Sequence, residues 1–160
     1  MITERDLTHL QRCIELAEEA VEAGDEPFGS ILVSKDNKVL FEDRNRVNTK
    51  NDPTRHPEFA IARWAAENLD PKERVTTTVY TSGEHCPMCA AAHGWVELGR
   101  IVYASSSTQL TKWLDNIGVG PSMVQSLSIA ELVPSIEVEG PVPELAKKVK
   151  ALHKQFHGSK

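Results

Sequence analysis

His56-Pro57-Glu58 and Cys86-Pro87-Met88-Cys89 are the two segments around which the rest of the chain can be organised. In each, a residue type that binds metals stands directly before a proline, and proline is favoured in the first turn of a helix. His56 and Cys86 are therefore predicted at helix N-termini. Cys89 lies three residues after Cys86, about one helical turn further on, so the two thiols can face the same point.

These residue types have the chemistry of a zinc site. A helix N-terminus stabilises negative charge and lowers the pKa of a thiol, which favours the thiolates that zinc binds. One imidazole with two thiolates suits Zn²⁺ better than Mg²⁺ or Ca²⁺, which prefer oxygen ligands. Structural zinc sites have four protein ligands, whereas catalytic sites keep one position for water. The motifs supply three ligands, so they predict an open position, with Glu58 beside it to take a proton from water.

The segments around the two motifs alternate between helical and strand-like patterns. Apolar residues recur at helical spacing in some segments, and β-branched or apolar runs between turn residues mark others as strands. The predicted helices cover about residues 4–23, 57–69, 87–98, 108–116 and 143–157, and the predicted strands cover residues 28–34, 39–43, 75–81 and 101–103. This alternation indicates an α/β layered fold with a mixed sheet. Without an internal repeat or a linker, residues 1–160 are expected to form a single domain.

The composition is that of a globular protein with a slight excess of acidic groups. The 160 residues include 18 lysines and arginines against 23 aspartates and glutamates, a net charge of −5. This balance argues against nucleic acid as the main partner, because binding a phosphate backbone depends on lysine and arginine. The chain has no run of about 18 apolar residues that would cross a membrane. Its charged start, residues 1–6, lacks the apolar stretch of a secretion signal, so a cytoplasmic protein is expected.

At the two motifs the chain resembles the zinc-dependent nucleobase and nucleoside deaminase family, whose signature is H-x-E followed by P-C-x-x-C. The resemblance covers about residues 24–104. Within it, Pro27-Phe28-Gly29 and the segment 52–58 are most similar to the bacterial guanine deaminase branch. The resemblance implies the three-layer α-β-α cytidine deaminase-like fold, with a central mixed sheet of about five strands. One departure is His85, which stands where the signature has proline.

The resemblance also implies a role for each motif residue. His56, Cys86 and Cys89 would hold Zn²⁺, and Glu58 would be the catalytic proton shuttle. A zinc-bound hydroxide would attack the amino-bearing ring carbon of the substrate, and ammonia would leave. The expected activity is hydrolytic deamination of a free nucleobase or nucleoside. A guanine-like purine is favoured, and a cytosine- or cytidine-type pyrimidine comes next.

Four further residues are predicted to contact the substrate. By the resemblance, Asn45 would hydrogen-bond the base or sugar, and Phe28 would pack against the flat ring. His93 follows Cys89 by four residues and shares its helical face, so it is expected either to line the pocket or to pack in the core. Asp115 is the nearest acidic candidate in the segment after residue 103, with a solvated helix position as its alternative.

Three other interpretations stay open on the sequence alone. A tRNA adenosine deaminase of the same superfamily is favoured by the basic C-terminal helix. A non-enzymatic zinc-stabilised module would result if His85 were a fourth ligand. A thioredoxin-like redox role for the two cysteines leaves His56 and Glu58 unexplained. Family members are commonly homodimers, so a homodimer is expected, with Trp95 and Trp113 as core or dimer-contact residues.

Overall fold

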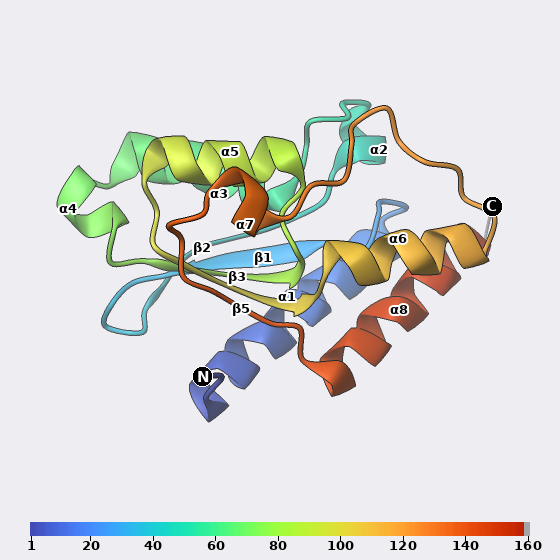
Figure 1. Cartoon of the computed structure of the whole chain (residues 1–160), viewed down its shortest axis with the longest axis horizontal. Helices are drawn as coiled ribbons and strands as arrows, with labels where there is room; N and C mark the ends of the chain where they lie inside the picture. Colours follow the sequence, from blue (N-terminus) through green and yellow to red (C-terminus); the bar gives the residue numbers. More distant parts are fainter. Residues whose placement is uncertain (159–160) are drawn as a thin grey trace.

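A five-stranded mixed sheet forms the centre of the protein, with the strands in the order β2-β1-β3-β4-β5 (Figure 1). The computed structural model describes residues 1–158. The strands are β1 (Gly29–Val33), β2 (Val39–Arg44), β3 (Thr78–Gly83), β4 (Arg100–Ser105) and β5 (Val138–Glu139). β1 runs antiparallel to both β2 and β3, whereas β3, β4 and β5 are parallel.

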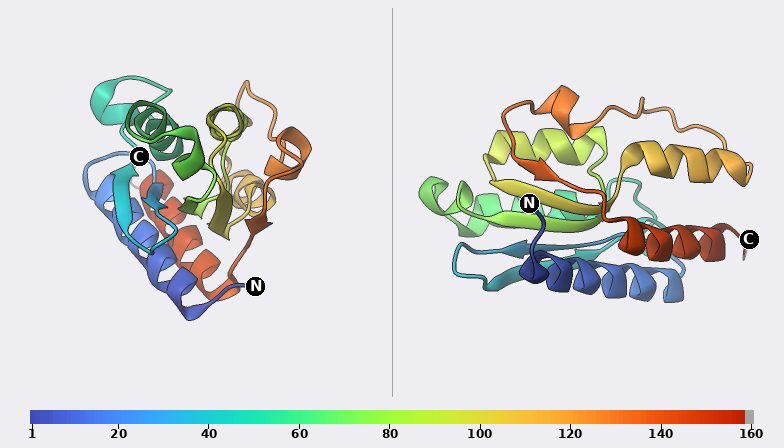
Figure 2. Two further views of the ribbon diagram at one scale, coloured as in Figure 1. Left: turned by 90° about the vertical axis from the view of Figure 1, so that its left-hand side faces the viewer. Right: turned by 60° about the horizontal axis from the view of Figure 1, so that its bottom comes forward.

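Helices cover both faces of this sheet. They are α1 (Glu4–Glu22), α2 (Val47–Lys50), α3 (Pro57–Asn68), α4 (Pro71–Arg74), α5 (Pro87–Val96), α6 (Ser107–Asn116), α7 (Ile129–Leu132) and α8 (Pro143–Gly158). α3 and α5 lie together on one face, and α1 and α8 lie on the other (Figures 1 and 2). The three-layer α-β-α arrangement expected from the sequence is therefore confirmed.

Three apolar clusters hold the layers together: one packs with α1 and α8, one packs under α3, and one joins α5, α7 and β4. β1 is buried along its whole length, so its successive side chains enter different clusters. Ile31 packs with Leu10 and other residues of α1 and α8, whereas Leu32 packs with Ile61 of α3. α1 approaches β1 so closely that a Cβ at Gly29 would lie 2.4 Å from the Cys13 carbonyl oxygen. Glycine at this position is what permits the contact.

The predicted helices and strands are all present, but four short elements were missed. α2, α4 and α7 have four residues each and β5 has two, which is too short for a periodic pattern. The strand predicted over residues 75–81 begins later, at Thr78. The Thr76 and Thr77 hydroxyls donate to carbonyls in α4, which extends the turn, and Val75 is 57% exposed. Among residues 1–158, no helix has the length and apolar character to cross a membrane.

Candidate metal centre and active site

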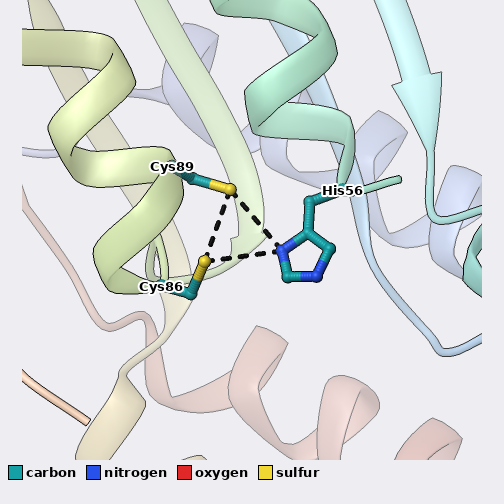
Figure 3. A group of neighbouring side chains, drawn as sticks. All are labelled: His56, Cys86 and Cys89. Carbon is teal, nitrogen blue, oxygen red and sulfur yellow. Dashed lines mark hydrogen bonds between the residues drawn. The ribbon is translucent and has the colours of Figure 1, made fainter. Parts of the chain in front are cut away.

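The two motif segments open helices, as their prolines predict. His56 is the N-cap of α3 and Cys86 is the N-cap of α5, each with the proline at the next position. Cys89 lies one turn into α5 and is fully buried. The two helices pack side by side, so the imidazole from α3 and the two thiols from α5 meet between their N-termini (Figure 3).

The distances among the three ligand atoms fit a bound zinc ion. His56 Nδ1 lies 3.4 Å from Cys86 Sγ and 3.5 Å from Cys89 Sγ, and the two sulfurs are 3.5 Å apart. Tetrahedral zinc, with bonds of about 2.3 Å to sulfur and 2.0–2.1 Å to nitrogen, separates its ligands by roughly 3.5–3.8 Å. Within the described chain, no other histidine, cysteine or carboxylate joins this group. The donor set therefore suits zinc and leaves one tetrahedral position open.

The three groups shift one another's pKa values. Hydrogen bonding with Cys89 and His56 lowers the pKa of Cys86 to about 4. The contact with Cys86 raises the pKa of His56 to about 9. The hydrogen bond to Cys86, together with burial, raises the pKa of Cys89. A cation bound among the three would favour loss of a proton from both thiols and from the His56 imidazolium, because zinc binds thiolates and neutral imidazole.

Glu58, in the first turn of α3, lies next to the metal ligands. It is 6% exposed, and its carboxyl group is close enough to Cys89 to contribute to the raised pKa of that thiol. Ser30 Oγ donates to Glu58 Oε1 at 2.8 Å, and Thr81 Oγ1 lies 3.2 Å from the same oxygen. Burial raises the pKa of Glu58, so this carboxyl takes up a proton more readily than an exposed glutamate. Such a group suits proton transfer near neutral pH.

Phe28 and Asn45 lie at the same end of the strands as His56, Cys86 and Cys89. Phe28 directly precedes β1, Asn45 directly follows β2, and the backbone N–H of Asn45 donates to the Phe28 carbonyl at 2.9 Å. The Phe28 ring lies against Gly83 at the end of β3, where a Cβ would be 3.3 Å from Cε1 of the ring. Because Cys86 follows Gly83 closely in the chain, the structure brings these two predicted substrate residues to the end of the sheet where the metal ligands lie.

The chain matches the family described as the cytidine and deoxycytidylate deaminase zinc-binding region, over residues 3–105. It belongs to this deaminase family. The matched part includes the grouped residues His56, Cys86 and Cys89 and also Glu58.

Individual members of the deaminase family show the range of this similarity. The guanine deaminase of Bacillus subtilis is 40% identical over 102 residues, which are 63% of this chain and 65% of that protein. A probable cytosine deaminase of Schizosaccharomyces pombe is 31% identical over 145 residues, 89% of this chain and 88% of that protein. The structure of guanine deaminase from Nitrosomonas europaea matches with a TM-score of 0.74 over 99% of this chain and 86% of its own, at 18% identity. That last match supports the cytidine deaminase-like fold.

His93 and Asp115, also predicted to contact the substrate, lie outside the group formed by His56, Cys86 and Cys89. His93 is 1% exposed, and its Nε2 bonds the Gly99 carbonyl at 2.8 Å, beyond the C-terminal end of α5. It is therefore a packed core histidine, the second of its two expected positions. Asp115 is exposed near the end of α6. Ser107, at the start of α6, contacts Glu84 in the loop before Cys86. Asp115 follows Ser107 by eight residues, which places it about 12 Å further along the helix from this contact.

His85 does not join the group formed by His56, Cys86 and Cys89. Its ring nitrogens lie outside the group formed by the three ligands. The side chain is 1% exposed, both ring nitrogens lack a hydrogen-bond partner, and its ring centroid is 5.5 Å from that of His93. Burial lowers the pKa of His85, so its ring is neutral. The three-ligand arrangement disfavours the closed, non-enzymatic zinc module.

Sequence reasoning missed three residues around the site. Ser30 and Thr81 contact Glu58, and the available signal was a hydroxyl side chain within an apolar strand segment. His153 of α8 is 2% exposed, and its ring centroid is 5.2 Å from that of Phe28 and 6.2 Å from that of Trp113. Burial lowers the pKa of His153 to about 3, so the ring behind Phe28 is neutral. No pattern in the sequence links α8 to Phe28.

Proposed function

We propose that this chain is a zinc-dependent hydrolytic deaminase of a free nucleobase or nucleoside, with a guanine-like purine as the favoured substrate. The observation that carries the proposal is the three-ligand metal group with the buried carboxyl of Glu58 beside it. The 40% identity to a guanine deaminase supports the choice of purine, and the similarity to a probable cytosine deaminase makes a pyrimidine the second choice.

In the proposed reaction, water replaces the amino group of the base, and ammonia is released. Zinc held by His56, Cys86 and Cys89 would supply Lewis-acid activation of water near neutral pH. Glu58 takes one proton from the attacking water and delivers it to the departing amino group. The second water proton ends on the ring nitrogen next to the reacting carbon, so the carbon–nitrogen bond breaks as the carbonyl forms, and the products are ammonia and the lactam form of the base. The buried position of Glu58 keeps bulk water from competing for this proton.

Asn45 and Phe28 are proposed to recognise the base. Asn45 Oδ1 accepts a hydrogen bond from the Val47 N–H at 3.0 Å, which fixes the orientation of the amide. That leaves the Asn45 NH₂ group as a donor for a carbonyl or ring nitrogen of the substrate. The Phe28 ring offers a flat apolar surface, and stacking of a base on an aromatic ring is worth about 1–3 kcal/mol. The larger ring system of a purine makes better use of this surface.

An ammonia-release assay with the purified chain tests the proposal. Guanine, cytosine, adenine and their nucleosides are supplied separately, with zinc per chain measured on the same sample. We expect release from at least one of them, and we expect Glu58→Ala to reduce kcat by at least about a hundredfold while zinc stays bound. Activity of Glu58→Ala equal to wild type would remove Glu58 from the mechanism. No release from any of these compounds would refute the function.

A tRNA adenosine deaminase is the second candidate. Lys147, Lys148 and Lys154 are exposed on α8, as a phosphate-binding surface requires. However, α8 lies on the opposite face of the sheet from α3 and α5, which carry the metal ligands (Figure 2). Lys148 also donates to Gln11 of α1. Salt-sensitive binding of tRNA in a gel-shift experiment, with inosine formed in the bound RNA, would favour this candidate over the first.

We further propose that the protein is a homodimer that pairs through α5. This helix contains no lysine, arginine, aspartate or glutamate, and Trp95 is 89% exposed on it. A helix that is apolar on all sides is normally buried, and a two-fold axis beside α5 would let two copies cover each other. Sedimentation velocity should give a dimer for the wild type and a monomer for Trp95→Lys. A wild-type monomer would refute this pairing. The three free cysteines suit a reducing compartment, so we propose a cytoplasmic location.

A further inference from the structure

Two buried hydroxyl groups face α3 from neighbouring strands. Ser30 of β1 and Thr81 of β3 are direct partners in the antiparallel ladder, so their side chains point to the same face of the sheet. The next pair on that face, Leu32 and Val79, is apolar and packs in the cluster under α3. Both hydroxyl residues are completely buried, at 0% exposure. Burying a hydroxyl is costly unless it is hydrogen-bonded, so the partners of this pair are informative.

Both hydroxyls contact the same oxygen of Glu58. Ser30 Oγ is 2.8 Å from Glu58 Oε1 and 2.8 Å from Thr81 Oγ1. Thr81 Oγ1 is 3.2 Å from Glu58 Oε1 and 2.9 Å from the Gly83 carbonyl. Each hydroxyl has a single hydrogen. When Ser30 donates to Glu58, the hydrogen of Thr81 is available to Ser30 or to the Gly83 carbonyl.

We propose that Ser30 and Thr81 are positioning residues for Glu58, an inference that rests on the proposed deaminase function. By binding Oε1 they fix the carboxylate in one orientation and leave Oε2 as the oxygen that exchanges protons with water and substrate. A glutamate side chain has several rotatable bonds, and a misplacement of about 1 Å in an active site reduces the rate by about a hundredfold. The hydroxyl pair prevents that misplacement.

The two hydroxyls have unequal roles. Ser30 makes the shorter contact with Glu58 Oε1, so it is the main donor. Thr81 Oγ1 is already 3.2 Å from the same oxygen and replaces Ser30 after a rotation of its hydrogen. Loss of one hydroxyl is therefore partly compensated by the other. The double substitution should reduce the rate by more than the product of the two single effects.

The test compares kcat, KM and zinc content for Ser30→Ala, Thr81→Val and the double variant. Thr81→Ser keeps the hydroxyl that Thr81→Val removes, and Ser105→Ala removes a buried hydroxyl that instead donates to the Ser82 carbonyl. We expect kcat to fall about tenfold or more in the double variant, the size expected for loss of a hydrogen bond to a charged group. KM and zinc per chain should stay within about twofold of wild type. Thr81→Ser and Ser105→Ala should keep wild-type kcat.

Crystal structures of the zinc-loaded wild type and double variant supply a readout that is independent of activity. We expect Glu58 Oε1 to contact the two hydroxyls in the wild type and the Glu58 carboxylate to turn in the double variant. An unmoved Glu58, wild-type kcat in the double variant, or a loss of kcat matched by loss of zinc would overturn the proposal. A wild-type protein that releases no ammonia would refute the proposed function, and the two structures would still decide how Glu58 is held.

Discussion

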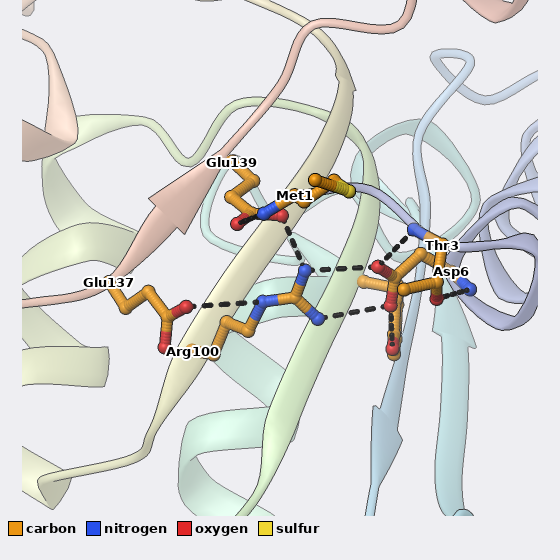
Figure 4. A network of polar contacts seen from close by, with 7 residues as sticks. Met1, Thr3, Asp6, Arg100, Glu137 and Glu139 are labelled. Atoms are coloured by element: carbon orange, nitrogen blue, oxygen red, sulfur yellow. Dashed lines mark hydrogen bonds and ion pairs between the residues drawn. The ribbon is translucent and has the colours of Figure 1, made fainter.

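Replacement of Asp6 by asparagine is expected to lower the free energy of unfolding by about 3 kcal/mol at pH 7. Asp6 lies in the first turn of α1 and is 3% exposed. Arg100, at the start of β4, donates to both of its carboxylate oxygens at 3.0 Å (Figure 4). The Tyr80 hydroxyl donates to it at 2.7 Å, and the Thr3 N–H donates at 2.9 Å.

The magnitude follows from the bonds that asparagine weakens. A hydrogen bond to a charged group contributes about 1.5–3 kcal/mol and a neutral one about 0.5–1.5 kcal/mol, so weakening both Arg100 bonds costs roughly 2–3 kcal/mol. The NH₂ group of the introduced asparagine also faces the N–H and O–H groups that bound the carboxylate, so it has no acceptor among them. Arg100 keeps Glu139 as a partner at 2.6 Å, which holds the loss near the lower end of the range of about 3–5 kcal/mol for a broken buried pair.

Urea and thermal unfolding of the zinc-loaded protein measure this loss. Because 1 kcal/mol corresponds to about 2–4 °C in a protein of this size, Tm should fall by about 6–12 °C. The control is Glu137→Gln, since Glu137 is 69% exposed and 3.8 Å from Arg100 Nε. An exposed ion pair of this kind contributes at most about 1 kcal/mol. Glu137→Gln should therefore leave Tm nearly unchanged.

The same substitution has a defined pH dependence. Burial raises the pKa of Asp6, but hydrogen bonds from Arg100 and Tyr80 outweigh it and hold the pKa well below its ordinary value. A carboxyl whose pKa is lowered by folding stabilises the protein above its unfolded pKa of about 3.9 and loses this contribution as the pH falls. The difference between wild type and Asp6→Asn should be smaller at pH 3 than at pH 7. A difference below about 1 kcal/mol at pH 7, or an equal one at pH 3, would refute the reasoning.

Three other outcomes are expected. Gly29→Ala should destabilise the protein by about 1–3 kcal/mol in urea, because its Cβ would lie 2.4 Å from the Cys13 carbonyl oxygen. Gly120→Ala, with no atom within 4 Å of the added Cβ, is the control, and equal effects would contradict the close-contact argument. Phe28→Ala should raise KM for the base about tenfold, from the loss of roughly 1–3 kcal/mol of stacking; an unchanged KM would place the base elsewhere. Removing zinc by chelation should lower Tm by about 5–11 °C. This is the effect of losing a ligand present at about 100 times its Kd. An unaltered Tm would show that zinc contributes nothing to stability.

The grouping of the three candidate metal ligands was predictable because each residue has a local signal. Proline after His56 and after Cys86 fixes both residues at helix starts, and the spacing to Cys89 completes the group. The long helices and the buried strand β1 also follow from local apolar patterns. These parts of the fold depend on neighbours that are close in the sequence.

The remaining contacts depend on which distant segments meet. His93 and Cys89 share a helical face, but the His93 ring hydrogen-bonds to the Gly99 carbonyl beyond the end of α5 and is not part of the group formed with His56. Ser30 and Thr81 are brought together by strand register, which neither segment specifies alone. The position of His153 behind Phe28 depends on how α8 packs across the sheet. Such contacts follow from tertiary packing, and no local pattern predicts them.

His153 and Trp113, which pack behind Phe28, lie outside the part of the chain that matches the family. Every group proposed to bind the metal or move the proton lies within residues 3–105, the part that matches the family, whereas these two aromatic supports come from α6 and α8 beyond it. Exchange of the C-terminal segment would therefore reshape the wall against which a base rests without rebuilding the reactive groups. A chimera carrying the tail of a relative offers a direct route to altered selectivity on an unchanged catalytic frame.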